Sequence, residues 1–286
     1  MADISAALVM KLRKMSGQGM MDCKKALIEA GGDLDEAIAL LRKKGLATLA
    51  KRAGRETSEG RVVCKRSEDG RTAAMATLCC ETDFVAKSDD FVAAADALAE
   101  YLSVCDSDEG AENILATAVD GRKFSEVLTE TVSKIGEKIE VGDFTKYQLG
   151  GAGAIGTYVH FNNKLGSMVE IETGSDDVAN SLVSVAGDIA MHITAIKPVA
   201  VDSDSIDPAI VEKEKEIAAE QMKNKPANII DKIIEGKMRK FFKDNCLLEQ
   251  AFVKDDSRTV AQALAEAVRQ AGGQAKIKRF VRFEIG

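Results

Sequence analysis

The sequence predicts an α+β protein with a small N-terminal three-helix bundle, a core of two repeated units and a projecting helical hairpin. Three observations lead to this prediction. Helical patterns separated by glycines fill the N-terminal region, a hairpin-plus-helix pattern occurs twice further along, and all three prolines fall in one helical stretch. The predicted divisions are 1–55 (bundle and basic linker), 56–141 and 142–197 (the two core units), 198–243 (helical arm) and 244–286 (a segment completing the core).

Composition favours a folded protein of the cytoplasm. The 286 residues carry a net charge of −7, which disfavours general nucleic-acid binding. Residues 1–55 are nevertheless basic, with 11 Lys and Arg against 6 Asp and Glu. No apolar run approaches the ~18 residues that cross a bilayer, and the N-terminus lacks the pattern of a secretory signal. The six cysteines are therefore expected to be reduced, and neither a membrane nor a cofactor is expected.

The N-terminal region reads as three short helices of the ubiquitin-associated type. Ser5 is placed to cap the first and Asp33 the third, and Gly45 is expected to end that third helix. The second helix is marked by an apolar stripe of Cys23, Ala26, Leu27 and Ala30. Met20 and Met21 lie at a loop–helix junction. Core filling is the preferred interpretation of this pair, and an adaptable apolar contact is the alternative.

The core contains an internal repeat. Each unit has two β-rich runs around a turn, followed by a helix that begins at a capping serine, Ser88 or Ser175. The runs and helices are Val62–Cys64, Ala73–Cys80 and 89–104 in the first unit, and Thr157–Phe161, Leu165–Glu172 and 176–193 in the second.

The first unit carries four extra residues between strand and helix. Glu81 lies 7 positions before Ser88, whereas the equivalent Glu172 lies 3 positions before Ser175. The plainest placement makes the insertion Asp83-Phe84-Val85-Ala86. Because the sister unit makes the same connection without it, the fold does not need it. We expect it to protrude toward a partner, the alternative being that its aromatic ring folds back onto the core.

Three further segments complete the prediction. Leu128, Val132, Ile135 and Ile139 mark an amphipathic helix that Gly136 interrupts, either at a close contact or at a plain helix end. A helical arm follows, with Pro226 opening its second helix over Ile230, Ile233, Ile234, Met238 and Phe241; it either stabilises the fold or offers a self-association or partner surface. A last helix, Arg258–Ala271, precedes a strand that alternates Ile277, Val281, Phe283 and Ile285 with charged residues.

The sequence contains fragments of several catalytic motifs but favours none of the corresponding sites. Gly151–Gly156 matches G-x-G-x-x-G, but strand-forming residues follow it, whereas a dinucleotide site needs a helix there. No P-loop motif or Ser/His/Asp arrangement is found, and two histidines without a C-x-x-C pair support zinc poorly. Cys79 and Cys80 are neighbours in a strand, so they face opposite ways and one is expected to be buried.

Long ordered motifs give the chain a family resemblance. Met15–Leu27, Cys80–Ala86, Asp188–Ile193, Asn228–Phe242 and Phe280–Glu284 resemble blocks of bacterial elongation factor Ts. The resemblance covers essentially the whole chain, with Cys79 a small departure where Asn is commoner.

This resemblance implies a guanine-nucleotide exchange factor, not an enzyme, whose partner is the GTPase elongation factor Tu. It implies that Thr82, Asp83, Phe84 and Val85 enter the GTPase near its magnesium and phosphates. Further contacts that it implies are Met20 and Met21 on the bundle, Ile135 and Gly136 near the phosphate loop, and His160 at another domain. Two alternatives stay open: a nicotinamide-dependent enzyme using Gly151–Gly156, and a pure scaffold.

Overall fold

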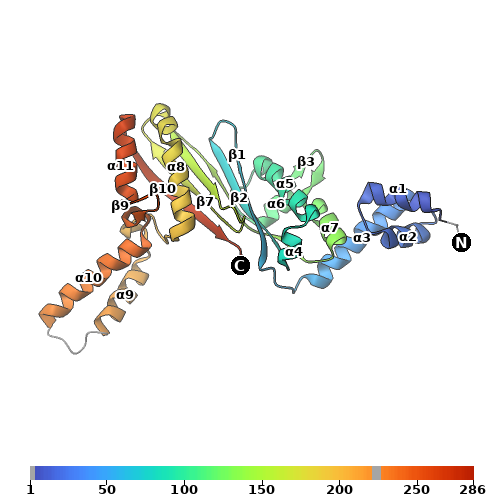
Figure 1. The fold of residues 1–286 in the computed structure, drawn as a ribbon, viewed down its shortest axis with the longest axis horizontal. Coiled ribbons are helices and arrows are strands. Elements are labelled where there is room, and N and C mark those ends of the chain that lie inside the picture. The colour runs from blue at the N-terminus through green and yellow to red at the C-terminus, as the bar shows by residue number, and fades with distance from the viewer. Residues whose placement is uncertain (1–3, 221–226) are drawn as a thin grey trace.

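The computed structural model describes residues 4–220 and 227–286 of an elongated molecule (Figure 1). The N-terminal bundle lies at one end, two β-sheets with their covering helices lie in the middle, and the helical arm projects at the other end. The predicted α+β class, with a helical bundle before the sheets, is confirmed.

Local capping chemistry sets the helix starts of the N-terminal bundle. Ser5 Oγ accepts the Leu8 amide at 3.2 Å, and Asp33 Oδ1 accepts the amides of Asp35 and Glu36 at 2.9 Å, so both predicted caps are confirmed. The three helices are α1 (Ala6–Ser16), α2 (Met20–Glu29) and α3 (Leu34–Arg52). Their shared core consists of Val9, Leu12, Cys23, Ala26, Leu27, Ala30, Ala37 and Leu41.

The prediction that Gly45 ends the third helix is wrong. Helix α3 continues through it to Arg52, so the predicted helical linker belongs to the same helix. Gly45 is buried because α3 crosses close to another helix there: a Cβ at this position would lie 2.8 Å from the Thr129 carbonyl oxygen. The glycine therefore permits a close helix crossing.

Two three-stranded antiparallel sheets form the middle of the molecule. Their orders are β1-β2-β5 and β10-β7-β6, so each predicted hairpin is confirmed and each receives a third strand from later in the chain. The strands are β1 (Glu59–Arg66), β2 (Thr72–Cys80), β5 (Ile139–Gln148), β6 (Gly153–Val159), β7 (Leu165–Thr173) and β10 (Ala275–Glu284).

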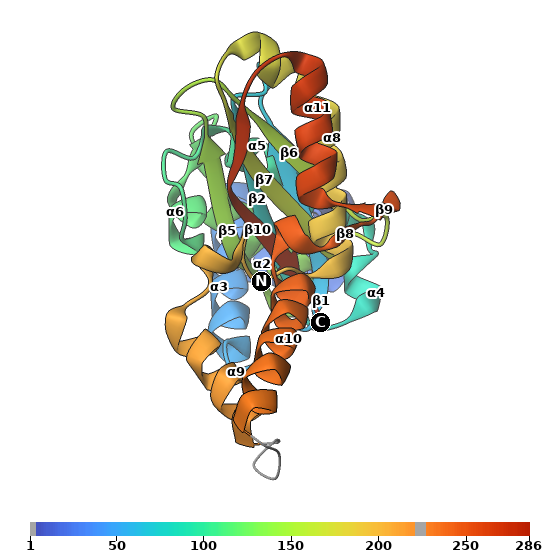
Figure 2. The same cartoon turned by 90° about the vertical axis from the view of Figure 1, so that its left-hand side faces the viewer.

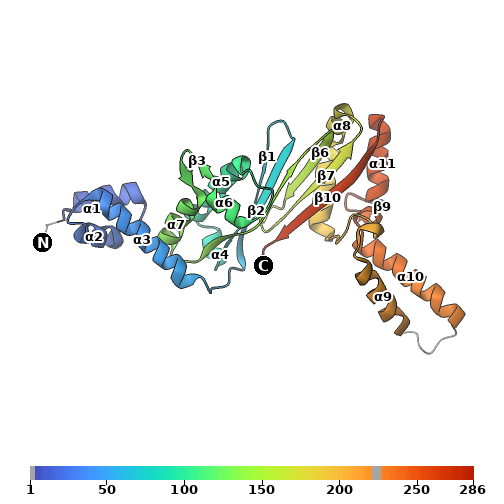
Figure 3. The same cartoon turned by 180° about the vertical axis from the view of Figure 1, so that it is seen from behind.

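The two sheets pack on each other and carry helices on their outer faces. In β2, Ala74 and Leu78 face the helix-side core, whereas Ala73 and Met75 join Met168 of the other sheet in a shared core. Burial on both faces explains why this strand is a continuous apolar run in the sequence. Figure 3 shows the second sheet from behind, with β10 running toward the first.

The helices over the first sheet belong to one apolar core. They are α5 (Asp89–Val104), capped by Ser88 as predicted, α6 (Ala111–Ala116) and α7 (Phe124–Ile135), with a small hairpin of β3 (Ala118–Val119) and β4 (Arg122–Lys123) between the last two. The predicted helical stripe from Leu128 to Ile139 is wrong at its end. Gly136 takes a left-handed φ of 81° as the C-cap of α7, and Ile139 begins β5.

The second sheet is covered by α8 (Asp176–Ile196), capped by Ser175 as predicted, and α11 (Val260–Ala271). Within the described part of the chain, α8 is the helix long and apolar enough to cross a membrane by length and composition. Its apolar face is already covered, because Leu182, Ala186 and Ile189 are fully buried against β6 and β7. Its hydropathy is that of a core helix.

A β-bulge breaks the simple alternation predicted for the last strand. The register shifts between Ile277 and Arg279, so Ile277 faces the helices while Phe283 faces the other sheet. The bulge also brings two consecutive cations to one buried carboxylate. Lys278 Nζ and Arg279 Nε lie 3.0 and 2.7 Å from the oxygens of Glu170, which is 1% exposed.

The helical arm projects from the base of α8 (Figure 2). It contains α9 (Pro208–Glu220) and α10 (Ala227–Asn245), flanked by the 3₁₀ turns η1 (Ser203–Ser205) and η2 (Leu247–Glu249). Pro226 and the Ile230 side chain lie outside the described residues. The last helix starts two residues later than predicted, at Val260 after the capping residue Thr259. Arg258 instead belongs to a hairpin of β8 (Ala251–Phe252) and β9 (Asp255–Thr259).

Candidate partner-binding site

The inserted segment forms a single helical turn, α4 (Asp83–Ala86), that presents an aromatic ring to solvent. Phe84 is 83% exposed, so the alternative in which its ring folds back onto the core is wrong. Val85 points the other way and packs against the helix-side core of the first sheet. One turn of helix thus separates an anchoring apolar side chain from a displayed one.

Hydrogen bonds hold both ends of this turn. Thr82 Oγ1 accepts the Val85 amide at 3.3 Å, and Ser88 Oγ donates to the Val85 carbonyl at 2.8 Å. Arg61 Nε of β1 donates to the Ala86 carbonyl at 3.1 Å. A four-residue helix would not persist alone, so its conformation depends on these contacts. Figure 2 shows α4 at the margin of the molecule beside β1.

Asp83 is charged and paired in the free protein. Its Oδ2 accepts a hydrogen bond from Lys87 Nζ at 2.7 Å, one turn away and exposed. This bond is the main reason why the pKa of Asp83 lies below its usual value. Near neutral pH the exposed turn therefore presents a carboxylate beside the Phe84 ring.

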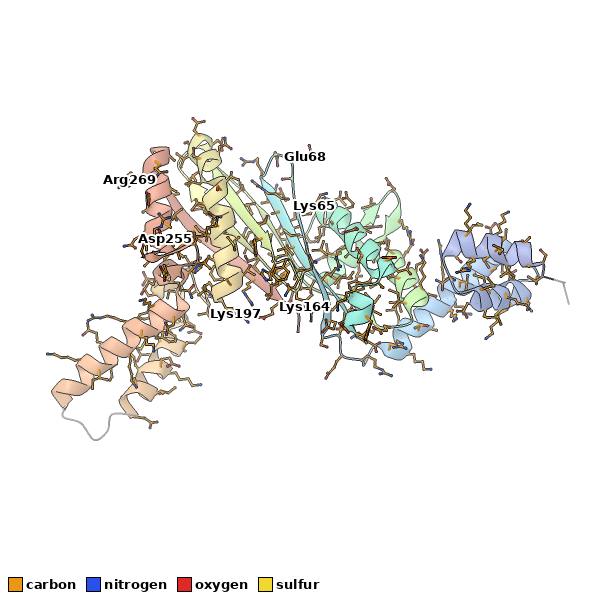
Figure 4. The ribbon with its side chains drawn as sticks, viewed as in Figure 1. Lys65, Glu68, Lys164, Lys197, Asp255 and Arg269 are labelled. Atoms are coloured by element: carbon orange, nitrogen blue, oxygen red, sulfur yellow. The ribbon has the colours of Figure 1, made fainter. Side chains whose placement is uncertain are left out.

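The tip of the second hairpin lies near the same end of β1. The Val62 amide donates to the Asn163 carbonyl at 2.7 Å, and Lys164 Nζ lies 2.7 Å from Glu59 Oε2. Figure 4 places Lys164 at the lower edge of the sheets. The predicted contact His160 is at this tip. The first residues of β1 therefore contact both elements, α4 through Arg61 and the hairpin tip through Val62.

A second exposed aromatic residue at this tip was not predicted as a functional residue. Phe161 is 87% exposed, and its ring centroid lies 4.3 Å from that of His160. The His160 ring is also 3.2 Å from the Tyr158 hydroxyl through Nδ1. The available signal was the position of Phe161, a large apolar residue directly before an Asn-Asn turn where no core lies.

Two other predicted contacts lie on the first unit's helices and on the bundle. Ile135 is the last residue of α7 and Gly136 is its C-cap, and hydrogen bonds connect the following residue, Glu137, to Thr82. Met20 and Met21 begin α2 and are 50% and 63% exposed, so the preferred interpretation of core filling is wrong. They stand apart from α4 and offer adaptable apolar surface on the bundle.

The glycine motif and the cysteine pair lack functional geometry. Gly153 begins β6 and no helix opens after Gly156, whose added Cβ would meet the Ala186 carbonyl; the glycine permits close packing of a strand on α8. Cys80 is buried while Cys79 is half-buried on the other face, and burial raises the pKa of the Cys80 thiol to about 12. A thiol of that kind is inert at neutral pH.

Comparison with known proteins agrees with the resemblance. Residues 81–286 match the family model described as Elongation factor TS. The chain is 45% identical over 285 residues to elongation factor Ts of a Nitratiruptor species, which covers 99% of this chain and 93% of that protein. It is 43% identical to elongation factor Ts of Alkalilimnicola ehrlichii and 41% identical to that of Nitratidesulfovibrio vulgaris, each over 99% of this chain and over 92% and 96% of those proteins. The chain therefore belongs to the elongation factor Ts family, whose members act in translation elongation.

Proposed function

We propose that this chain is a guanine-nucleotide exchange factor for elongation factor Tu. It binds the GDP-bound and nucleotide-free forms of the GTPase, disturbs the magnesium and phosphate site, and promotes GDP release and GTP loading in the cytoplasm. It acts through protein contact and catalyses no covalent reaction. The observation that carries the proposal is Phe84, held 83% exposed on a turn that is anchored at both ends.

The proposed mechanism follows from how a GTPase holds its nucleotide. Backbone amides, a lysine and magnesium neutralise the phosphates, so displacing part of this set weakens GDP binding. Phe84 acts as an apolar wedge and Asp83 adds negative charge beside it. Because binding is reciprocal, a factor that lowers nucleotide affinity is itself released when GTP binds.

The remaining predicted contacts are proposed to orient the factor. Ile135 and Gly136 sit next to the wedge and address the phosphate loop, and His160, with Phe161 beside it, addresses another domain of the GTPase. Met20 and Met21 rest on the GTPase domain from the bundle. All of these residues except Gly136 offer side chains that are at least partly exposed.

The direct test is release of fluorescent GDP from elongation factor Tu in the presence of the factor. Phe84→Ala is expected to lower the stimulated release rate at least about tenfold, equivalent to ~1.4 kcal/mol of barrier. Its unfolding midpoint should stay at the wild-type value, because an exposed ring contributes little to the core.

A matched control separates wedge action from a general loss of apolar surface. Ile210→Ala removes a 51% exposed apolar side chain from the arm and is expected to leave release unchanged. Wild-type release by Phe84→Ala would eliminate the wedge. Binding of the wild-type factor without any faster GDP release would instead favour the scaffold alternative.

A further inference from the structure

Two loops beside the candidate site exchange carboxylate hydrogen bonds. Glu137, after α7, accepts the Thr82 amide through Oε2 at 3.2 Å and the Thr82 hydroxyl through Oε1 at 2.9 Å. Glu81, after β2, accepts the Lys138 amide through Oε1 at 2.6 Å. Each loop therefore supplies a carboxylate that binds the backbone of the other. Arg52 of α3 joins the pair, with Nη1 2.7 Å from Glu81 Oε1.

The Glu137 contact controls the cap of α4. A hydroxyl has one proton to donate, and Thr82 donates it to Glu137. Its lone pairs are then free to accept the Val85 amide, which is the capping bond of the turn that displays Phe84. Glu137 therefore orients the Thr82 hydroxyl in the direction that this short helix needs.

The backbone around Gly136 makes the reach of Glu137 feasible. Gly136 has a left-handed φ of 81°, which reverses the chain after α7 and turns Glu137 toward Thr82. The Glu81 side chain is 14% exposed, and the hydrogen bond from the Lys138 amide is the main cause of its lowered pKa. Both carboxylates thus accept backbone amides in a partly water-excluded setting, where charge-assisted bonds are strong.

We propose that Glu81 and Glu137 form a carboxylate clasp that joins the Thr82–Val85 segment and the Ile135–Gly136 turn into one rigid unit, with Glu137 as the positioning residue for Phe84. This inference rests on the exchange function proposed above. The two segments that address the magnesium site and the phosphate loop move together, and the ordering of the wedge is completed before the partner arrives. Preorganisation of this kind favours binding because less conformational entropy is lost at the encounter.

The clasp predicts local loosening without global unfolding. In Glu137→Ala, amide hydrogen exchange of residues 82–86 in the free protein should accelerate at least about tenfold, because a charge-assisted pair of bonds to the cap is lost. Amide hydrogen exchange in β2 and the unfolding midpoint should both stay near the wild-type values. Glu68→Ala, in the exposed turn between β1 and β2, is the matched control and should change neither quantity.

The functional readout is a double-mutant cycle with Phe84→Ala, measured as GDP release from elongation factor Tu. Glu137→Ala alone should slow release about tenfold, and in the Phe84→Ala background it should add less than about twofold, because it acts through that ring. Additive effects of the two substitutions would overturn the positioning role. If Glu137→Ala fails to fold, Glu137→Gln and Thr82→Val keep the side-chain volume and carry the same cycle.

The two proposals fail separately. Unchanged release by Phe84→Ala would defeat the wedge, while accelerated amide exchange in Glu137→Ala would still support the clasp. Slow release by Phe84→Ala together with wild-type amide exchange and wild-type release in Glu137→Ala would overturn the clasp and leave the wedge standing.

Discussion

His192 shows how one buried side chain joins the core to the base of the arm. It is fully buried on α8, its Nδ1 accepts the Val253 amide at 3.1 Å, and its Nε2 lies 2.9 Å from Gln250 Oε1. Gln250 Nε2 in turn donates to the Asp244 carbonyl at 2.8 Å. Since an amide is only a donor, Nδ1 must be unprotonated, so the ring is neutral and donates through Nε2.

This neutral ring gives the fold a dependence on pH. Burial is the main cause of a His192 pKa below 6.5, so the unfolded chain takes up a proton at a higher pH than the folded one. The stabilisation that comes from keeping His192 neutral is complete above pH 6.5, and it is lost as the pH falls toward the pKa of His192 in the folded protein. Over that interval the free energy of unfolding should fall by up to about 1.4 kcal/mol per pH unit.

Urea unfolding between pH 7.5 and 5.5 measures this effect. His192→Gln should be less stable at pH 7.5, because the Val253 amide and Gln250 Oε1 lose their imidazole partner. Its stability should, however, depend less on pH in this range. Parallel profiles for the two proteins would show that His192 is not the titrating group.

At the scale of elements, two glycines in helices should respond oppositely to the same substitution. Alanine favours a helix over glycine by about 1 kcal/mol. In α10, no atom of the residues that the structure describes lies within 4 Å of a Cβ added at Gly236, so Gly236→Ala should stabilise the protein by up to that amount. At Gly45 the added Cβ would lie 2.8 Å from the Thr129 carbonyl oxygen and 3.1 Å from Ser133 Cβ, so α3 and α7 must move apart.

Overpacking of this kind costs about 1–3 kcal/mol, so Gly45→Ala should be destabilising despite the better helix propensity. Denaturant unfolding of both variants tests the prediction through opposite shifts of the midpoint. A stabilised Gly45→Ala protein would mean that the α3–α7 crossing can relax.

The elements that could be predicted from sequence are those with local causes. Ser5, Asp33, Ser88 and Ser175 cap their helices within a few residues of themselves, and the hairpin turns lie between runs of strand formers. Gly45 and Gly136 could not be distinguished in this way. Each interrupts a helical pattern, and only the approach of another helix or the C-cap geometry decides whether the helix continues.

The candidate site follows the same division. The insertion containing Phe84 could be found because the repeat supplies an internal reference for the length of the connection. Glu137 could not, since its role depends on a contact across 55 positions. Phe161 had only a weak signal, its place before the Asn-Asn turn, because its exposure depends on where the hairpin tip meets solvent. The bulge that brings Lys278 and Arg279 onto Glu170 is likewise a product of strand pairing.

At the scale of the whole molecule, the repeat explains where the arm is inserted. In each unit a hairpin and a helix are followed by a third strand that pairs with the second strand of the hairpin. In the first unit the chain between the helix and the third strand forms α6, the β3–β4 hairpin and α7. In the second unit it forms the arm, η2, the β8–β9 hairpin and α11. The arm is thus a departure within a repeated plan.

The arm should be dispensable for nucleotide exchange. Its ends are held together at the core, where Ala200 bridges Cys246 and the Val199 amide donates to the Asn245 carbonyl at 2.9 Å. Replacing 212–238 by a short Gly-Ser linker leaves this base in place. Because α4 and the arm lie on opposite sides of the paired sheets (Figure 1), GDP release should stay within about twofold, or ~0.4 kcal/mol, of the full chain.

Light scattering of the same shortened variant addresses the alternatives left open for the arm. An assembly of the full chain that becomes a monomer on excision would identify the arm as a self-association surface. An unchanged oligomeric state with a lower unfolding midpoint would identify a stabilising element. Slower GDP release would contradict the prediction, since it would mean that the arm reaches the GTPase around the far side of the two sheets and that the exchange surface extends well beyond the clasped turn.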